Sequence, residues 1–512
     1  MRRISGARLT VLACLACALV FARTPLSGID GYVSKTVQEW KEPGLAIAIV
    51  KDDKVALLKG YGVRRDGGVK PIDPDSIFEI GSLTKAFTAA ALGVLVDEGK
   101  LHWDDRVIDH MPDFRLYDPW VTREIRVRDL LCHRSGLPAY GGDLIAFGSI
   151  YDRQELIRRL RFIKPVSSFR SAYAYSNLMV LTAGQLIPRI TGKTWDEFVR
   201  ERIFAPLGMR STYTSTSQLP AGGDIATPHI YIDGKSQPDE RGNYDNIGPA
   251  GSINSTARDM AQWIRLQLDA GTVDGRKLFS EEVSREMWSA QTPIHAKPSA
   301  GLPTPQFQAY GLGWGISEYR GHKLLSHGGA LSGMTARIAI MPDEKLGFVI
   351  LTNGELPVQT PLMYRILDAY LGGQERDWSG EALARFDHEQ ANDRAKSKKE
   401  DAQRLIGTKP PLALASYAGT YRSDAFGDIK ITQRENKLEI RLLPLPRVIG
   451  DAEYWQYGAF RITWRDPGWP KTFLLFRINA NGTIADARLQ LAEGADPSFD
   501  FQDYVFERQH TP

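Results

Sequence analysis

The stretch Ser82-Leu83-Thr84-Lys85 constrains the fold of this chain more than any other part of the sequence. Residues 75–81 before it alternate like a strand and end in a glycine turn. Residues 86–95 after it are apolar nearly all round, which is typical of a buried helix. Residues three apart share a helix face, so Lys85 is predicted to reach the Ser82 hydroxyl where a strand gives way to a buried helix.

This serine and lysine form a candidate reactive pair. A serine hydroxyl is unreactive at its free pKa and needs a neighbouring base, which an amine supplies only when it is deprotonated. Burial in an apolar helix lowers the pKa of a lysine in that direction. The alternative is that Ser82 is a plain helix cap, although a capping box has Glu or Gln three residues on, and a cation in the first turn opposes the helix dipole. Ser82 is the only serine in the chain followed by lysine at this spacing.

A second candidate motif, Tyr173-Ala174-Tyr175-Ser176-Asn177, stands just before a predicted helix over 178–190. A tyrosine near a lysine can exchange protons with a serine hydroxyl or with a leaving group. The alternative is a Ser or Asn helix cap that follows a packed aromatic ring. The pattern also occurs at Tyr244-Asp245-Asn246, but in a polar loop with no helix after it.

A third motif, residues 325–333, contains His327-Gly328-Gly329 on or beside a strand that leads toward Ala336. Glycines allow a strand to approach a substrate closely, and backbone N–H groups there could stabilise an oxyanion. The alternative is a glycine-rich turn with an exposed histidine.

The strand-like runs of the first two thirds fit one antiparallel sheet. Residues 44–50 and 54–58 are predicted to form a hairpin that turns at Asp52-Asp53, and strands return at 336–341 and 346–352. Helical patterns dominate residues 125–204, which predicts a mainly helical insertion. Together these segments predict an α+β domain, with helices on the faces of the sheet.

The three motifs, in this order, resemble the β-lactamase-related serine hydrolases, which include class C β-lactamases, D-alanyl-D-alanine carboxypeptidases, D-aminopeptidases and related esterases. The resemblance runs from about Asp30 to Asn353. It extends to stretches without chemistry: 101–107, 111–114, 130–138, 206–209 and 250–260. It implies a β-lactamase/transpeptidase-like fold, an antiparallel sheet flanked by helices with a helical subdomain.

The resemblance also implies roles for single residues. Ser82 would be the nucleophile, Lys85 its activating partner, Tyr175 a proton shuttle and Asn177 a substrate-binding amide. The backbone N–H groups of Ser82 and Ala330 would form the oxyanion hole. The division of the base role between Lys85 and Tyr175 stays open, as it does for related enzymes.

The chain departs from β-lactamases at His327-Gly328-Gly329, where they carry Lys-Thr-Gly. His327 and Gly329 would line the substrate site in this position. Loss of the fixed lysine cation argues against β-lactamase activity, and the His-x-Gly version resembles D-aminopeptidases and their relatives.

The chain divides into four predicted segments: a signal peptide (1–22), the hydrolase-like domain (30–375), a polar helical linker (376–411) and a β-rich domain (412–509). Short alternating strands and an Asn481-Gly482 turn predict that the last segment is a small antiparallel barrel. It resembles the lipocalin-like domain that follows such hydrolase domains in D-stereospecific serine proteases. The alternative is an interaction or oligomerisation module.

The first 22 residues resemble a secretory leader, with three arginines, an apolar run over 9–21 and a small-residue cleavage site. The run is short for a membrane span. Export to the periplasm or medium is therefore predicted, with lipoprotein attachment at Cys14 or Cys17 as the alternative. Without the leader the chain holds 61 basic and 61 acidic residues, so nothing favours nucleic acid as a partner. Cys132 is then the only cysteine left.

The sequence thus predicts an exported serine hydrolase that cleaves amide or ester bonds through an acyl-enzyme on Ser82, either a D-aminopeptidase-like peptidase or an esterase. The alternatives are a β-lactamase or DD-carboxypeptidase acting on cell-wall peptides, and an inactive binding or scaffold protein. A small-molecule or short-peptide substrate is expected, with no cofactor, no metal and no transmembrane span in the mature chain. Homo-oligomers formed through the C-terminal domain are left open.

Overall fold

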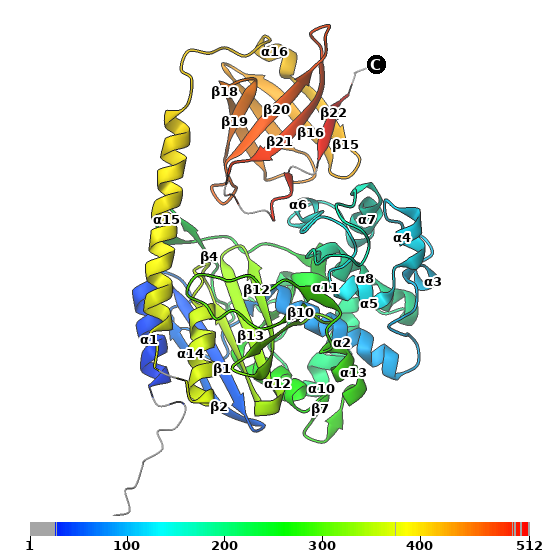
Figure 1. The fold of residues 1–512 in the computed structure, drawn as a ribbon, viewed down its shortest axis with the longest axis vertical. Helices are drawn as coiled ribbons and strands as arrows, with labels where there is room; N and C mark the ends of the chain where they lie inside the picture. Colours follow the sequence, from blue (N-terminus) through cyan, green and yellow to red (C-terminus); the bar gives the residue numbers. More distant parts are fainter. Residues whose placement is uncertain are drawn as a thin grey trace, which may run out of the picture.

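The computed structural model describes residues 26, 28–373, 375–493, 495, 498–501 and 504–509. The expected leader, residues 1–22, lies outside the described residues. Figure 1 shows an α/β body below, a long helix along one side and a β-barrel above the body. In the described residues, we find no helix with the length and apolar character that crossing a bilayer requires.

The body is built on an eight-stranded sheet in which all neighbouring strands are antiparallel. In spatial order the strands are β2 (Lys54–Gly62), β1 (Gly44–Lys51), β14 (Leu346–Thr352), β13 (Met334–Met341), β12 (His322–Leu331), β11 (Gly315–Tyr319), β10 (Gln308–Tyr310) and β9 (Thr292–Ile294). The predicted hairpin is confirmed, since Asp52 and Asp53 turn between β1 and β2 with φ of 50° and 62°. The late strands pair beside β1, as predicted.

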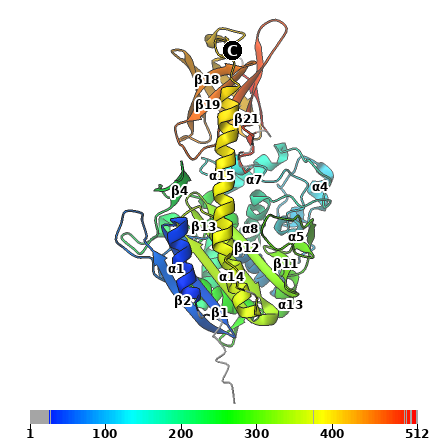
Figure 2. The same cartoon turned by 60° about the vertical axis from the view of Figure 1, so that its left-hand side comes forward.

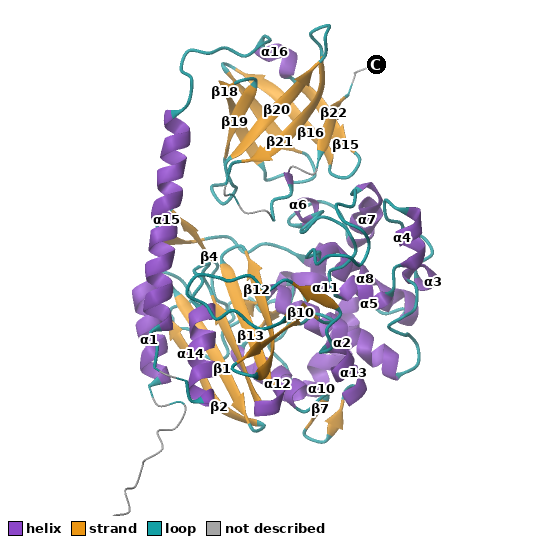
Figure 3. Cartoon of the chain, viewed as in Figure 1, coloured by secondary structure: helices purple, strands orange, loops and turns teal. Residues whose placement is uncertain are grey.

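Helices cover both faces of this sheet (Figure 3). Successive side chains of a strand point to opposite faces, and β1 divides its residues accordingly. Leu45, Ile47 and Ile49 belong to a core with α1 (Ile29–Trp40) and α14 (Gln359–Leu371). Alternate residues of β1 belong to a larger core with α2 (Thr84–Asp97) and α12 (Ala257–Leu268). Because both faces are covered, β1 is almost entirely apolar.

The predicted helical insertion is present between α2 and α12. It contains α3 (Val107–His110), α4 (Pro119–Glu124), α5 (Val127–Leu131), α6 (Asp143–Ala146), α7 (Arg153–Arg159), α8 (Asn177–Thr191), α9 (Trp195–Val199), α10 (Ala205–Leu207) and α11 (Gly248–Gly251). Shorter elements complete the body: β3 (Phe78–Glu79) with β6 (Asn254–Ser255), β4 (His229–Ile232) with β5 (Lys235–Pro238), β7 (Thr272–Val273) with β8 (Arg276–Lys277), and α13 (Glu281–Met287). The strand expected over 75–81 is shorter than its alternation suggested, because only Phe78 and Glu79 find a partner strand.

The polar segment after the body is the helix α15 (Trp378–Ala402), followed by an irregular stretch. Figure 2 shows α15 rising from the body to the barrel. Its start is fixed on α1, where the Trp40 indole N–H donates to the Ser379 hydroxyl at 3.0 Å. Its end reaches the barrel, where Arg461 pairs with Asp401 at 2.7 Å. Most of the helix between these contacts is exposed, which explains its polar composition.

The C-terminal domain is a closed barrel of eight antiparallel strands, as the β-rich pattern predicted. Its elements are α16 (Leu414–Tyr417), β15 (Gly419–Ser423), β16 (Gly427–Arg434), β17 (Lys437–Leu442), β18 (Ile449–Gln456), β19 (Ala459–Trp464), β20 (Thr472–Ile478), β21 (Ile484–Leu491) and β22 (Val505–Arg508). Aromatic rings fill part of its interior: the ring centres of Tyr417, Phe460 and Phe476 lie within 5.7 Å of one another. The α+β body followed by a small barrel confirms the predicted fold class.

Candidate active site

Ser82 lies in a 3₁₀ turn, Gly81–Leu83, between β3 and α2. Helix α2 begins at Thr84, directly after this turn, in which Gly81 has a φ of 51°. A Cβ on Gly81 would lie 2.7 Å from the backbone nitrogen of Ala330. Glycine therefore lets the turn that carries Ser82 rest directly against β12.

The Lys85 side chain is fully buried beneath Ser82. Its amine lies 2.8 Å from Ser82 Oγ, 2.6 Å from Asn177 Oδ1 and 2.8 Å from the Ala250 carbonyl oxygen. Burial lowers the pKa of Lys85 to about 7, although the charge of Asp143 acts in the opposite direction. A large fraction of this lysine is therefore deprotonated near neutral pH.

The partners of the amine fix the direction of its lone pair. A neutral amine has two N–H bonds, and a side-chain oxygen of Asn177 and a carbonyl oxygen of Ala250 can only accept them. The third direction faces Ser82 Oγ at 2.8 Å. The deprotonated form of Lys85 thus points its lone pair at the serine hydroxyl, which is the geometry a general base requires.

Tyr175 approaches the same oxygen from the loop before α8. Its hydroxyl donates to Ser82 Oγ at 2.8 Å, and the Lys85 amine lies 4.8 Å from the centre of its ring. Burial raises the pKa of Tyr175 well above its usual value. The resting tyrosine is therefore a neutral phenol that donates a hydrogen bond, and it holds a proton beside the serine.

The Tyr-x-Asn motif combines a helix cap with site residues. The Ser176 hydroxyl accepts from the Met179 backbone N–H at 3.3 Å and caps α8. Asn177, the first residue of α8, accepts from Lys85 and donates to Asp143 Oδ2 at 2.7 Å. The two interpretations of this motif are compatible, because Ser176 caps the helix while Tyr175 contacts Ser82 and Asn177 contacts Lys85.

Strand β12 supplies the wall opposite the serine. β11 pairs with β12 as far as Gly315 opposite Ser326, whereas β13 continues along the other side to Leu331. Gly329 lies so close to the serine turn that a Cβ there would lie 2.1 Å from the Ile80 carbonyl oxygen. Ala330 is exposed beside this contact. The predicted oxyanion donors, the N–H groups of Ser82 and Ala330, are thus on neighbouring backbone segments.

His327 is buried, with both ring nitrogens engaged. Nδ1 is 2.6 Å from the Gly328 carbonyl oxygen, which can only accept, so Nδ1 carries the proton. Nε2 then accepts from the Tyr310 hydroxyl at 2.6 Å. Burial lowers the pKa of His327 to about 3, and Lys85 adds to the effect. The ring is therefore neutral at pH 7, where β-lactamases have a permanent cation.

The structure adds residues that the sequence analysis missed. Asp143 supports Asn177, and the Tyr310 hydroxyl donates to the unprotonated Nε2 of His327. His133 packs against Tyr175 with ring centres 4.2 Å apart, and burial holds its pKa well below the ordinary value. Sequence spacing could not identify these residues, since each is brought to the serine by a different element of the fold.

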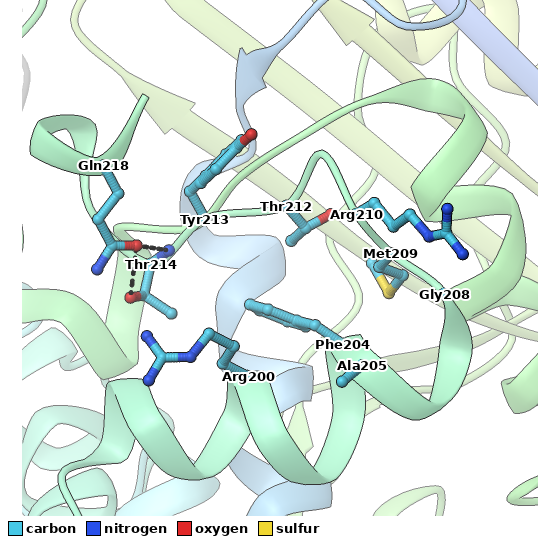
Figure 4. A pocket seen from close by; sticks show the side chains of 10 residues that line it. All are labelled: Arg200, Phe204, Ala205, Gly208, Met209, Arg210, Thr212, Tyr213, Thr214 and Gln218. Carbon is cyan, nitrogen blue, oxygen red and sulfur yellow. Dashed lines mark hydrogen bonds between the residues drawn. The ribbon is translucent and has the colours of Figure 1, made fainter. Parts of the chain in front are cut away.

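A pocket of about 440 Å³ lies elsewhere in the body, beside α10 (Figure 4). The side chains of Phe204, Met209 and Tyr213 and two guanidinium groups, Arg200 and Arg210, line it. Its lining includes no serine, histidine or carboxylate. The pocket therefore has no base for a nucleophile, and we assign the candidate chemistry to Ser82.

Comparison with known proteins identifies two families along the chain. The family described as "Beta-lactamase" matches residues 29–371, and a domain of unknown function, DUF3471, matches residues 403–508. The chain is 30% identical over 433 residues to "Unguisins hydrolase ungD'" of Aspergillus campestris, covering 79% of this chain and 77% of that protein. It is 28% identical to "Penicillin-binding protein 4" of Amycolatopsis lactamdurans, covering 61% and 81%.

Solved structures share the fold at lower sequence identity. The octameric penicillin-binding protein homologue from Pyrococcus abyssi has a TM-score of 0.61 at 22% identity and covers 94% of this chain and 99% of its own. The D-amino acid amidase from Ochrobactrum anthropi, complexed with L-phenylalanine amide, has a TM-score of 0.55 at 24% identity. It covers 68% of this chain and 99% of its own. The first similarity covers so much of this chain that it includes barrel residues.

Proposed function

This chain belongs to the beta-lactamase family of serine hydrolases, and we propose that it cleaves amide or ester bonds through an acyl-enzyme on Ser82. The observation that carries the proposal is the pair of 2.8 Å contacts that Lys85 Nζ and Tyr175 Oη make with Ser82 Oγ. One partner is a buried amine with a pKa of about 7, and the other is a protonated phenol. An acceptor and a donor of protons thus meet at one nucleophilic oxygen.

In the acylation step, Ser82 Oγ bonds to the substrate carbonyl carbon while its proton moves to the Lys85 amine. The carbonyl oxygen becomes an oxyanion, which the backbone N–H groups of Ser82 and Ala330 stabilise. As the tetrahedral intermediate collapses, the bond to the leaving group breaks, and that group takes a proton from the Tyr175 hydroxyl, which regains one from the Lys85 ammonium. Water then attacks the ester on Ser82, with the same groups acting in reverse.

The neutral His327 defines the substrate class we propose. A fixed cation at this position would favour substrates that carry a carboxylate, but the His327 ring is neutral at pH 7. Aminoacyl amides, short peptides with a D-residue and neutral esters fit such a site better than cephalosporins. A structural neighbour named as a D-amino acid amidase supports the amide as the scissile bond. We include export in the proposal on the basis of the leader-like residues 1–22.

The second candidate is a β-lactamase or a DD-carboxypeptidase that acts on cell-wall peptides. It is favoured by the relative named penicillin-binding protein 4. The neutral histidine in place of a lysine is the argument against it. A scaffold without activity is the alternative we favour least, because Ser82 has both the neighbouring amine and the neighbouring phenol that its proposed reaction requires.

The proposal is tested with a fluorophosphonate probe and a substrate panel. We expect the probe to label Ser82, and Ser82→Ala to abolish both labelling and turnover while the chain stays folded. Ser397→Ala, a partly exposed serine on α15, is the matched control. Tyr175→Phe should slow acylation by about 10²-fold or more. Labelling that survives Ser82→Ala would overturn the assignment of the nucleophile.

The panel decides the substrate class. It contains paired L- and D-aminoacyl amides, short esters and the chromogenic cephalosporin nitrocefin. We expect turnover of the amides or esters, with poor hydrolysis of nitrocefin. Efficient nitrocefin hydrolysis with no activity on the other substrates would favour the β-lactamase alternative.

A further inference from the structure

The barrel contacts the hydrolase body through a buried aspartate, Asp500, in the segment between β21 and β22. Asp500 Oδ2 accepts from the Gly142 backbone N–H at 2.7 Å, and Oδ1 accepts from that of Leu144 at 2.9 Å. The Tyr504 hydroxyl donates to Oδ2 at 2.7 Å, and Phe501 stacks on Trp464 inside the barrel. The carboxylate is thus anchored in the barrel while it binds the backbone of the body.

The residue between those two amides is Asp143, which supports the candidate active site. Its side chain accepts from the Asn177 amide at 2.7 Å, and the Asn177 oxygen accepts from the Lys85 amine at 2.6 Å. Asp500 is therefore connected to Lys85 through the backbone around Asp143 and then through two hydrogen bonds, from Asn177 to Asp143 and from Lys85 to Asn177. Figure 1 shows the lower end of the barrel above α6.

The charge of Asp143 also bears on Lys85. Four ionisable groups interact with this amine: Asp143, Tyr175, His133 and His327. Burial keeps the two histidines and the tyrosine in their neutral forms near pH 7. The carboxyl group of Asp143 is consequently the group whose charge opposes the loss of a proton from Lys85.

We propose that Asp500 is a positioning residue for this site: the C-terminal barrel uses it to hold Asp143 beside Asn177 and Lys85. The inference rests on the proposed function for its catalytic consequence. Glycine is also required at position 142. Its φ of 90° is unfavourable for other residues, and a Cβ there would lie 2.3 Å from a methyl group of Leu178. The barrel is then part of the structure that sets the reactivity of Ser82.

The test measures the pKa of Lys85 directly in the full chain. Lysine is labelled with ¹³C at Cε, and the Lys85 signal is identified by its loss in Lys85→Ala. Asp143→Asn removes the charge and should lower the pKa of Lys85 by about one pH unit. Asp500→Ala should shift it in the same direction, and Asp500→Asn, which keeps one acceptor oxygen, should shift it less.

Asp486→Asn is the matched control, because Asp486 is a buried barrel aspartate whose partner, Arg477, lies in the barrel. We expect it to leave the pKa of Lys85 unchanged. The pH dependence of labelling by the fluorophosphonate probe gives a second measurement. Its rise should move to lower pH in Asp500→Ala, whereas general damage to the fold would lower the rate at every pH.

Two results would overturn the inference. One is a folded Asp500→Ala or Asp500→Asn variant in which both the Lys85 pKa and the labelling profile match the wild type. The other is an equal shift in Asp486→Asn, which would reduce Asp500 to a general contribution to barrel stability. The NMR titration requires no turnover, so it tests this inference even in a chain that does not acylate on Ser82. Failure of the wild-type chain to acylate would refute the proposed function alone.

Discussion

Lowering the pH should slow acylation of Ser82 by an amount that follows from the burial of Lys85. With a pKa of about 7, about half of the lysine is deprotonated at pH 7. At pH 5 only about 1% remains so, which predicts an acylation rate about 50-fold lower. The rate should rise through a single ionisation and reach a plateau above about pH 8. The sign follows from the role of the base, since only the neutral amine accepts the serine proton.

Other groups near the serine are not expected to disturb this profile. Burial lowers the pKa of His327 to about 3, and that of Tyr175 is raised well above its ordinary value, so both stay neutral across the range. Glu79 ionises in the same pH range as Lys85, because burial raises its pKa to about 7 while Arg241 opposes the shift. Glu79→Gln is therefore the matched variant, and it should preserve the midpoint.

The assay is stopped-flow acylation by an ester whose acyl group carries no ionisable atom, from pH 5 to pH 9. Lys85→Arg should remove the ionisation and lower the plateau by about 10² to 10⁴-fold, because a guanidinium does not lose its proton in this range. A rate that is flat between pH 5 and pH 8 would refute the base role of Lys85. A midpoint that moves with Glu79→Gln would transfer the ionisation to that carboxyl group.

Three further predictions concern substrate choice, the cleft wall and the barrel. His327→Lys should shift the preference toward carboxylate-bearing substrates, measured as the ratio of kcat/KM for matched acids and amides; an unchanged ratio would remove this position from substrate selection. Gly329→Ala should lower the free energy of unfolding by about 1–3 kcal/mol, because its Cβ would meet the Ile80 carbonyl oxygen, and it should also slow acylation; wild-type stability in a urea titration would contradict the close contact. A chain that ends at Leu405 should keep a folded body by circular dichroism but acylate more slowly than the full chain; insolubility at every boundary tried would show that the body does not fold alone.

Much of the fold and of the candidate site could be predicted from local patterns. The hairpin at Asp52-Asp53, helix α8 and the barrel follow from alternation, helical periodicity and turn residues within short windows. Ser82 and Lys85 share one turn of a helix, so their contact is local as well. The motif before α8 singles out Tyr175, and the family resemblance supplies its role as a proton shuttle.

What could not be predicted depends on contacts between distant segments. Asp143 reaches Asn177 across a loop that has no periodic pattern. The Nε2 atom of His327 is bonded to the hydroxyl of Tyr310, which belongs to a different strand. The 3₁₀ turn before α2 depends on the positive φ of Gly81, which lies directly against β12. These features follow from tertiary packing, and local sequence patterns do not show which distant segments pack together.

The barrel is tied to the body through α15 and through the helical insertion, and this arrangement restricts how the body can move. One attachment is α15, which is fixed on the sheet side at Ser379. The other is on the helical insertion, where the barrel meets Gly142 and where its Pro444 carbonyl oxygen accepts from the Ile150 backbone N–H at 3.0 Å. Ser82 lies between the sheet and the insertion. Sheet, barrel and insertion therefore form a closed loop of contacts, so the sheet and the insertion can separate around Ser82 only if one of these attachments bends or breaks.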